Sequence, residues 1–147
     1  MKLSDLYAAE TPTDSRTFSV LRSDFTDSGH KITLIDPTGD KAAKAAFMFD
    51  AAIKRRMKRY EADSADLLKE CEEAGDYSQF NVGFDFICQD LRDAFCREVV
   101  EGWDFDDDFS EANLQSAIDS FRAPALVSLQ RQIIDAFRRI GTERAKK

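Results

Sequence analysis

The strongest structural signal in the chain is residues 100–114, Val-Glu-Gly-Trp-Asp-Phe-Asp-Asp-Asp-Phe-Ser-Glu-Ala-Asn-Leu. This stretch includes the only tryptophan, Trp103, and places three aromatic side chains among four aspartates. Ser110 is typical of a helix N-cap, because its hydroxyl can accept a free backbone N–H two or three residues later. Glu111 suits the first turn, where the helix dipole favours a negative charge. The sequence therefore predicts a helix that ends near Gly102, an apolar and acidic loop, and a new helix from Ser110.

Apolar residues recur at helical spacing on both sides of this loop. A helix over residues 82–101 would carry one stripe made of Phe84, Ile87, Cys88, Leu91, Phe95 and Val99. A short helix after the loop and a final helix would turn inward Leu114, Ile118, Phe121, Leu126, Leu129, Ile133, Phe137 and Ile140. Pro124 suits the first turn of the final helix, where a missing N–H has no consequence, and Gly141 is expected to end it. We predict a helical core over residues 82–141 and a frayed tail over residues 142–147.

Residues 17–36 have the pattern of a β-hairpin. Apolar residues alternate with polar ones, as in half-buried strands, at Phe18, Val20, Ile32 and Leu34. The turn is predicted over residues 26–29, with Gly29 at positive φ, and Pro37 disfavours a longer second strand. Residues 1–16 are expected to form a loosely held terminus. Because an isolated hairpin is marginal in water, this one is expected to pack on helices or to pair with another chain.

Residues 40–75 are predicted to form a long basic helix, which Asp63-Ser64 can break in two. Gly75 suits the position just after its end. Five cations occur within six positions of this helix: Lys54, Arg55, Arg56, Lys58 and Arg59. Such a run leaves little of the local helix circumference for an apolar stripe.

The composition indicates one mainly α-helical domain of four or five helices with an N-terminal β-hairpin. The 147 residues are 43% hydrophobic, which is enough for a core and excludes wholesale disorder. The net charge of −7 argues against a protein built mainly to coat nucleic acid. No apolar run approaches the roughly 20 residues of a membrane helix, and the N-terminus lacks the apolar region of a signal peptide. The three cysteines, an odd number without a CxxC motif, predict buried, reduced thiols in a cytoplasm.

No arrangement of residues predicts catalysis, a cofactor site or a metal site. His30 is the only histidine, and nothing in the spacing supplies the partners that a catalytic base or a zinc ion needs. Asp104, Asp106 and Asp108 have the alternate spacing of a calcium loop. However, Phe109 stands where such a loop needs glycine, and Gln115 stands where it needs a chelating glutamate. We therefore expect a protein that is not an enzyme.

Two surfaces are candidates for binding partners, and each has a plainer alternative. Trp103 is interpreted either as a core anchor or as an interface hot spot. The basic run is interpreted either as a solvated helix face or as a patch for an acidic surface, such as the acidic loop of a neighbouring copy. The second alternative predicts a homo-oligomer. The candidate residues are Lys54, Arg55, Arg56, Lys58, Arg59, Trp103, Asp104, Phe105, Asp106, Asp107, Asp108 and Phe109.

Three parts of the chain resemble the tail assembly chaperones of long-tailed bacteriophages. They are the Gly-Trp–acidic loop–Phe-Ser-Glu-Ala-Asn-Leu pattern within residues 95–137, the strand and turn of residues 29–40, and the basic run of residues 54–59. The resemblance implies a protein of the host cytoplasm that binds the tape measure protein and keeps it soluble. It also implies promotion of tail tube assembly, absence from the mature virion, and a frameshifted longer form that contacts the tail tube protein. Contacts to the client are then expected from exposed members of Phe47, Phe49, Phe80, Phe84 and Phe105.

Two other classes of protein remain as alternatives. A small nucleic-acid-binding regulator would use the basic run of residues 54–59. The absence of interleaved aromatic residues there makes this class less favoured. An acidic inhibitory protein that mimics DNA would instead use the acidic loop.

Overall fold

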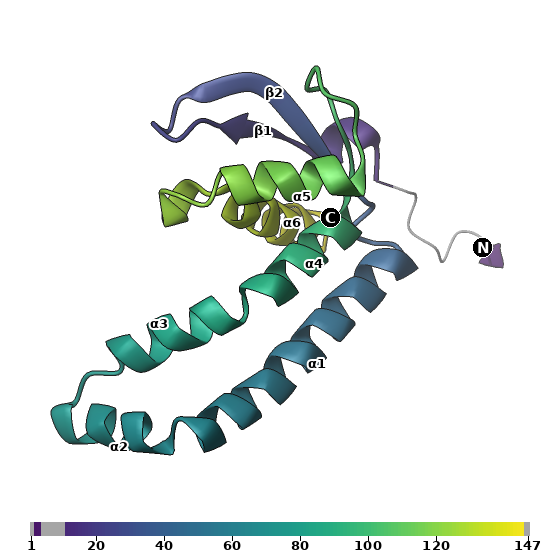
Figure 1. The fold of residues 1–147 in the computed structure, drawn as a ribbon. Helices are drawn as coiled ribbons and strands as arrows, with labels where there is room; N and C mark the ends of the chain where they lie inside the picture. Colours follow the sequence, from purple (N-terminus) through teal and green to yellow (C-terminus); the bar gives the residue numbers. More distant parts are fainter. Residues whose placement is uncertain (1, 4–10, 146–147) are drawn as a thin grey trace.

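The computed structural model describes residues 2–3 and 11–145 and shows a mainly α-helical fold with a small antiparallel sheet. Figure 1 shows a body made of the sheet, α5 and α6, from which α1, α2 and α3 extend as an arm, with α4 between them. The fold class predicted from the sequence is confirmed. The elements in chain order are η2 (Thr13–Arg16), β1 (Thr17–Leu21), β2 (Asp27–Leu34), α1 (Asp40–Asp63), α2 (Ala65–Ala74), α3 (Ser78–Ile87), α4 (Gln89–Val99), β3 (Val100–Trp103), α5 (Glu111–Ser120), η3 (Ala125–Val127) and α6 (Leu129–Ala145).

The predicted β-hairpin is present, but its turn lies elsewhere. The chain turns over residues 22–26, where the Arg22 N–H donates to the Thr26 carbonyl at 2.7 Å. The Asp24 carboxylate accepts from both the backbone N–H and the hydroxyl of Thr26, which stabilises this turn. Gly29 has the predicted positive φ of 78°, but it lies inside β2. The side-chain chemistry of Asp24 therefore determines the turn, and Gly29 does not.

A third strand, β3, replaces the predicted last turn of the helix before the acidic loop. After Val99 the backbone becomes extended, and β3 pairs antiparallel with β2, with Ile32 opposite Trp103. The sheet order is β1-β2-β3, so β2 is the central strand. The β-branched pair Val99-Val100 is buried at this change and favours the extended chain. The prediction of a helix to Gly102 was wrong.

The predicted helix over residues 82–101 is in fact two helices that begin earlier and end sooner. α3 begins at Ser78, in the predicted connector, where Asp76 accepts from the Ser78 backbone N–H at 2.9 Å. It ends at Ile87, and α4 follows after Cys88. In the long basic segment, the predicted break at Ser64 is confirmed, and Gly75 ends α2 with the positive φ of 68° that its role requires.

The arm is held together by aromatic contacts near its far end. The Tyr60 hydroxyl donates to the Phe80 carbonyl at 2.9 Å, and the Tyr60 ring lies against those of Phe80 and Phe84. A Cβ atom at Gly83 would lie 2.4 Å from the Tyr60 hydroxyl oxygen. Glycine at this position therefore allows α1 and α3 to approach each other closely.

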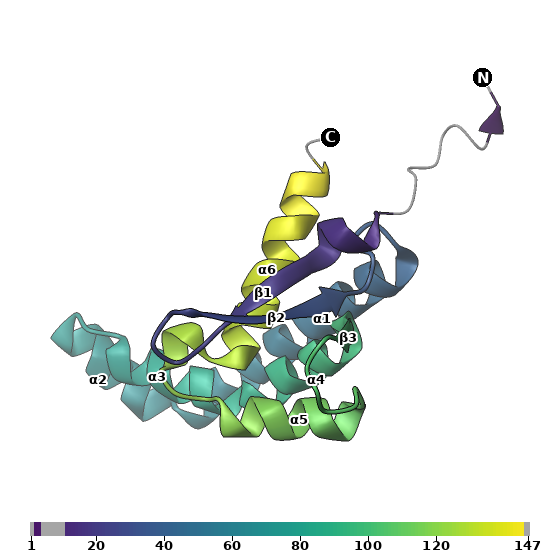
Figure 2. The ribbon, with the colours of Figure 1, turned by 90° about the horizontal axis from the view of Figure 1, so that it is seen from above.

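The main core lies between the sheet and the helices α4, α5 and α6. Its fully buried side chains include Ile32, Leu34, Val99, Leu114, Ile118 and Ile133. Figure 2 shows α6 crossing β1, and there the Gln132 side chain bonds both the N–H and the carbonyl of Leu21. α6 thus covers part of the outer edge of the sheet.

Several details of the C-terminal prediction were wrong. Pro124 precedes the short η3, and α6 begins only at Leu129, after Ser128 accepts from the Arg131 N–H. Leu126 is 75% exposed and does not face inward. α6 continues through Gly141 to Ala145, so the predicted frayed tail is helical as far as it is described. At the other end, Thr13–Arg16 form η2, and residues 4–10 of the expected loose terminus lie outside the described residues. None of the described helices is both long and apolar enough to span a membrane.

Candidate functional site

Trp103 lies at the end of β3, half-buried against the core, and its side chain holds the acidic loop. The indole N–H donates to the Asp107 carbonyl at 2.7 Å. The Phe105 and Phe109 rings meet the indole edge-on, with centroids 5.5 and 5.2 Å away. Trp103 and Phe105 also pack against the main core. Trp103 therefore packs against the core on one side and shapes the loop on the other, and its interpretation as an interface hot spot stays a prediction.

Hydrogen bonds fix the two ends of the loop. At its start, the Asp104 N–H donates to the Lys31 carbonyl, and the Lys31 N–H donates to the Asp104 carboxylate at 2.6 Å. At its end, Ser110 accepts from the Asn113 N–H at 3.0 Å, which confirms the predicted N-cap, and the Asn113 amide donates to the Asp108 carbonyl. His30 stacks on Phe105, with ring centroids 5.0 Å apart. The loop has a defined shape that residues outside it impose.

The fixed loop leaves its carboxylates in solvent. Asp106, Asp107 and Asp108 are exposed, and within the described residues none of them lies in an ion pair. Phe109, beside them, is 36% exposed. The loop thus presents three negative charges and the edge of one aromatic ring on a single turn of chain.

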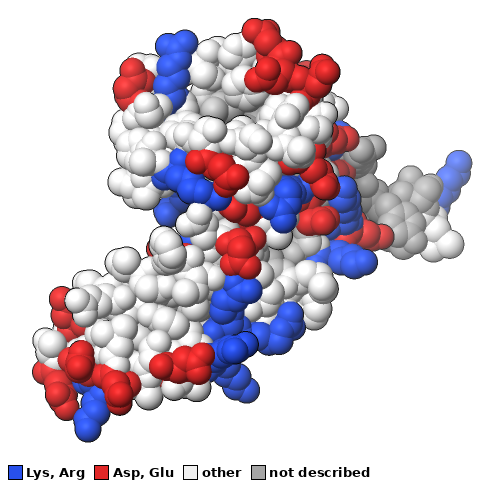
Figure 3. All heavy atoms as spheres, viewed as in Figure 1, with Lys and Arg blue, Asp and Glu red and all other residues white. Residues whose placement is uncertain are grey.

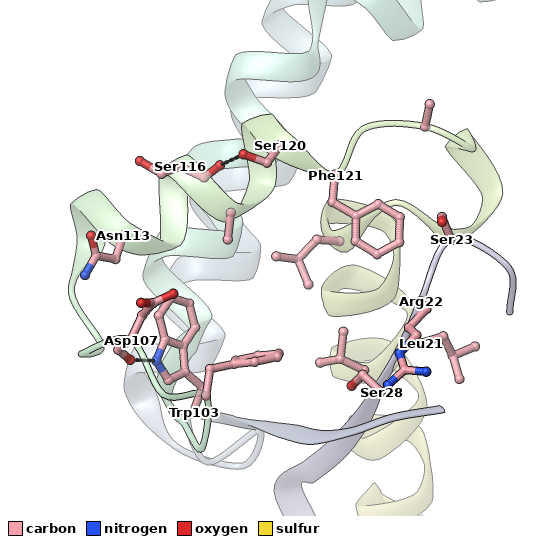
Figure 4. Close-up of a pocket in the computed structure, with 15 residues that line it drawn as sticks. Leu21, Arg22, Ser23, Ser28, Trp103, Asp107, Asn113, Ser116, Ser120 and Phe121 are labelled. Atoms are coloured by element: carbon pink, nitrogen blue, oxygen red, sulfur yellow. Dashed lines mark hydrogen bonds between the residues drawn. The ribbon is translucent and has the colours of Figure 1, made fainter. Parts of the chain in front are cut away.

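An open groove of about 770 Å³ lies between this loop, β1 and α5. Figure 4 shows Trp103, Phe121 and Leu21 around it, with Asn113, Ser116 and Ser120 along the α5 side. Its lining is largely apolar with a rim of hydroxyl and amide groups, and it contains no cluster of charged residues. The groove has the character of a binding surface.

The basic run does not form one patch. Arg56 turns toward α4, where it donates to the Ile87 carbonyl at 2.7 Å and pairs with Asp90. The hydrogen bond from Arg56 lowers the pKa of the Asp90 carboxyl. Arg59 lies 3.6 Å from Asp63 on the same helix. Lys54, Arg55 and Lys58 are exposed, and they make no ion pair with the described part of the chain.

The structure does not bring the basic run and the acidic loop together within one molecule. On the face of the molecule seen in Figure 3, acidic side chains gather at the top, over the connection from β3 to α5. Basic side chains gather lower down, over α1. Any contact between the two surfaces must therefore involve two copies of the chain.

The five phenylalanines considered as client contacts differ in their exposure to solvent. Phe47 is 72% exposed, whereas Phe80 is buried at 6% because it packs under Tyr60. Phe49, Phe84 and Phe105 are half-buried. Phe47 thus remains a candidate contact, and Phe80 does not.

The most exposed apolar surface on α3 was missed by the sequence analysis. Val82 is 68% exposed and Phe86 is 76% exposed. They border a second groove, of about 600 Å³, between α1, α3 and α6. The sequence contains a signal for it, since residues 80–87 have too many apolar side chains for one helix stripe to bury.

A buried polar cluster joins α4 to the two α-helices that follow the loop, α5 and α6. Asp93 on α4 is 6% exposed and accepts from Arg122 at 2.7 Å, from Gln115 at 3.0 Å, and from Gln130. Burial opposes ionisation of this carboxyl, but the three hydrogen-bonding partners outweigh it and lower its pKa. The cluster is structural, because it fixes α5 and α6 relative to α4.

The three cysteines are buried and unpaired, as predicted. Burial raises the pKa of both the Cys88 and the Cys96 thiol, so neither is activated as a nucleophile. Across the described ranges, no three His, Cys, Asp or Glu side chains are grouped so as to hold a metal ion.

A protein-family model matches most of the length of the chain. Residues 28–147 match the family model described as "Phage tail assembly chaperone". This range begins within β2 and includes the whole arm, the acidic loop and α6. Neither a curated protein nor a solved structure is similar enough to this chain to count as a match. Because the matched range covers well over half of the 147 residues, the chain belongs to the phage tail assembly chaperone family.

Proposed function

We propose that this protein binds the tape measure protein during assembly of a phage tail in the host cytoplasm. It keeps that long client soluble, promotes polymerisation of the tail tube around it, and is absent from the mature virion. A frameshifted longer form would carry the contact to the tail tube protein. The proposed role is one of binding, without catalysis.

The observation that carries this proposal is the apolar face of α3 that nothing in the described chain covers. Phe80 and Phe84 lie on the side that packs against Tyr60 of α1. Val82 and Phe86 lie about half a turn away, on the opposite side, because successive residues are about 100° apart on a helix. A helix with two apolar faces is expected to be covered on both. In a chaperone, the second face is available for a client.

The groove beside this face has the shape that an amphipathic helix requires. Its floor is apolar, with Phe49 and Ile53 from α1 and Ile134 from α6. Its rim carries charges of both signs, among them Asp50 and Arg138. A helical client would insert apolar side chains spaced three and four residues apart, which is the helix-in-groove mode of recognition. Burial of a side chain such as Phe86 contributes about 2 kcal/mol, so two or three such contacts supply about 4–6 kcal/mol, which corresponds to weak and reversible binding at this groove.

Co-expression with the tape measure protein of the same genome tests the proposal. The wild-type chain is expected to keep the client in the soluble fraction and to co-purify with it. The double variant Val82→Ser/Phe86→Ser should release the client into the pellet, while the variant itself stays folded because both positions are exposed. Phe25→Ser is the matched control, since Phe25 is also an exposed phenylalanine, at 60%, and lies at the tip of the hairpin.

Two results would count against this function. If the client precipitates equally with and without the wild-type protein, the chain is not its chaperone. If the α3 variant protects the client as well as the Phe25 control does, the client binds elsewhere and the α3 face is the wrong site.

A further inference from the structure

We propose that a third groove, between α1 and α4, binds a second amphipathic helix of the same client, so that one molecule holds the client at two points. We call it the α1–α4 groove. The inference rests on the function proposed above, because it takes the same client. It adds a second site on the other side of the contact between α1 and α4, and it specifies the charge pattern of the segment that binds there.

The α1–α4 groove is an open apolar channel of about 470 Å³. Met48, which lines it, is 54% exposed, so part of its apolar surface lies in solvent. Small and large side chains alternate along its floor: Ala45, Met48 and Ala52 from α1, and Leu91, Ala94 and Phe95 from α4. The alanines allow the backbone of a partner helix to approach closely, because the distance between packed helices depends on the side chains at the contact. The floor therefore fits one apolar stripe of a helix.

Charged side chains of opposite sign line the two walls of this groove. Lys41 and Lys44 are on the α1 wall, and Glu98 is on the α4 wall. All three are exposed, and none of them makes an ion pair with the described part of the chain. The charged residues of an amphipathic helix lie on either side of its apolar stripe. The walls therefore favour a helix with acidic residues on the side toward α1 and basic residues on the side toward α4.

One aromatic side chain separates the α1–α4 groove from the groove beside α3. Phe49 lines both grooves, and its ring packs on Phe95 with the centroids 4.8 Å apart. On a helical projection of α1, Phe49, Asp50 and Ile53 of the groove beside α3 are centred about a third of a turn from the residues of the α1–α4 groove. The two grooves thus open on different sides of α1 and can be occupied at the same time.

The weakness of a single groove favours one client at both sites. Two or three apolar contacts correspond to a Kd of about 0.05–1 mM, so a client at micromolar concentration would be mostly free. A second segment of the same client meets the α1–α4 groove at an effective concentration in the millimolar range, which tightens binding about 10- to 100-fold. A separate partner would gain nothing from the first contact.

The path between the grooves sets the spacing of the two client segments. The contact between α1 and α4 blocks the short way, so the client passes around the open side of α1. At the distance of a packed helix this path is about 40 Å long, which about 12 extended residues span. The two segments are therefore expected to lie at least about 12 residues apart in the client.

Binding of the client and of its fragments to two variants tests the inference. The probes are the tape measure protein of the same genome, fused to a solubility tag, and overlapping 25-residue peptides of it, measured by fluorescence anisotropy. Lys44→Glu/Met48→Ser changes the α1–α4 groove, and Val82→Ser/Phe86→Ser changes the groove beside α3; all four positions are exposed. Each variant should lose one set of peptides and keep the other, and should bind the intact client about 10- to 100-fold more weakly than the wild type does.

The two sets of peptides should differ in composition. Those lost by Lys44→Glu/Met48→Ser should carry acidic residues on one side of the apolar stripe. Their affinity for the wild type should fall severalfold at about 500 mM salt, because the charges on the groove walls are then screened.

The matched control is Lys69→Glu/Tyr77→Ser, which makes the same kinds of change at exposed positions outside both grooves. It should bind as the wild type does. The inference is overturned, and the proposed function stands, if Lys44→Glu/Met48→Ser binds the client as tightly as this control, or loses no peptide. It is also overturned if the α3 variant loses every peptide. If the wild type binds neither the client nor any peptide, the proposed function fails and the second site fails with it.

Discussion

Replacement of Asp93 by alanine tests whether the polar cluster holds α5 and α6 to α4. The change removes the acceptor of hydrogen bonds from Arg122, Gln115 and Gln130 at a site that is 6% exposed. Loss of one member of a fully buried ion pair costs about 3–5 kcal/mol. Two features reduce the effect here. The Arg122 side chain is 31% exposed, and Arg122 and Gln115 both keep Asp119 as an acceptor. We therefore expect a loss of about 2–3 kcal/mol in the free energy of unfolding.

Urea denaturation at neutral pH, followed by far-UV circular dichroism, measures this loss. Asp135→Ala is the control, because Asp135 is 53% exposed and pairs with Arg131 at 3.0 Å on the protein surface. A pair of this kind contributes at most about 1 kcal/mol. If Asp93→Ala destabilises the protein no more than Asp135→Ala does, the cluster does not join the helices and the reasoning is refuted.

The pH dependence of the same difference gives a second check. The pKa of Asp93 is lowered in the folded state, so its contribution is present above the unfolded pKa of about 3.9 and is lost as the pH falls through the folded value. The wild type and Asp93→Ala should therefore converge in stability at acid pH. A gap of constant size down to the acid unfolding transition would contradict this assignment.

Three further predictions follow from individual contacts. Burial raises the pKa of Asp36, but hydrogen bonds from residues 11 and 38 outweigh this effect and lower the pKa to about 2. Part of the stability that the wild type loses between about pH 4 and pH 2 in acid titrations should therefore already be absent in Asp36→Asn. A Cβ atom at position 83 would clash with the Tyr60 hydroxyl oxygen, so Gly83→Ala should speed amide hydrogen exchange in α3. Tyr60→Phe added to the same chain should offset part of this effect, because it removes the clashing oxygen. The three cysteines should react with a maleimide only as the protein unfolds, as mass spectrometry can follow; rapid labelling of the native protein would contradict their burial.

The parts of the fold that could be predicted from the sequence are those that local chemistry determines. The N-cap at Ser110, the break at Ser64 and the end of α2 at Gly75 each depend on one residue and its immediate neighbours. β3 depends instead on the open edge of β2, which is far away in the sequence. The apolar pattern before Val99 contains no information about that edge, so it predicts that the helix continues.

The candidate surfaces also have some properties that the local sequence determines and others that depend on distant contacts. The acidic loop and the basic run are visible in the sequence because charge is a property of each residue. Their partners within the molecule are not visible. Arg56 pairs with Asp90, and Phe80 is covered by Tyr60, because α1 folds back beside α3 and α4. The sequence therefore indicated where interaction surfaces lie, whereas the structure was needed to separate the free residues from the occupied ones.

The position of β3 also determines when this protein can fold during its synthesis. The central strand β2 lies between β1, which immediately precedes it, and β3, which the ribosome adds only after the whole arm. The arm and α4 lie between Ile35 and Val99, where the Ile35 N–H donates to the Val99 carbonyl at 2.8 Å. Until then the nascent chain carries an unpaired strand edge and a growing set of helices with no body to pack against. Changes in the length of the arm at Ser64 or Gly75 would prolong or shorten that interval and leave the finished sheet unchanged.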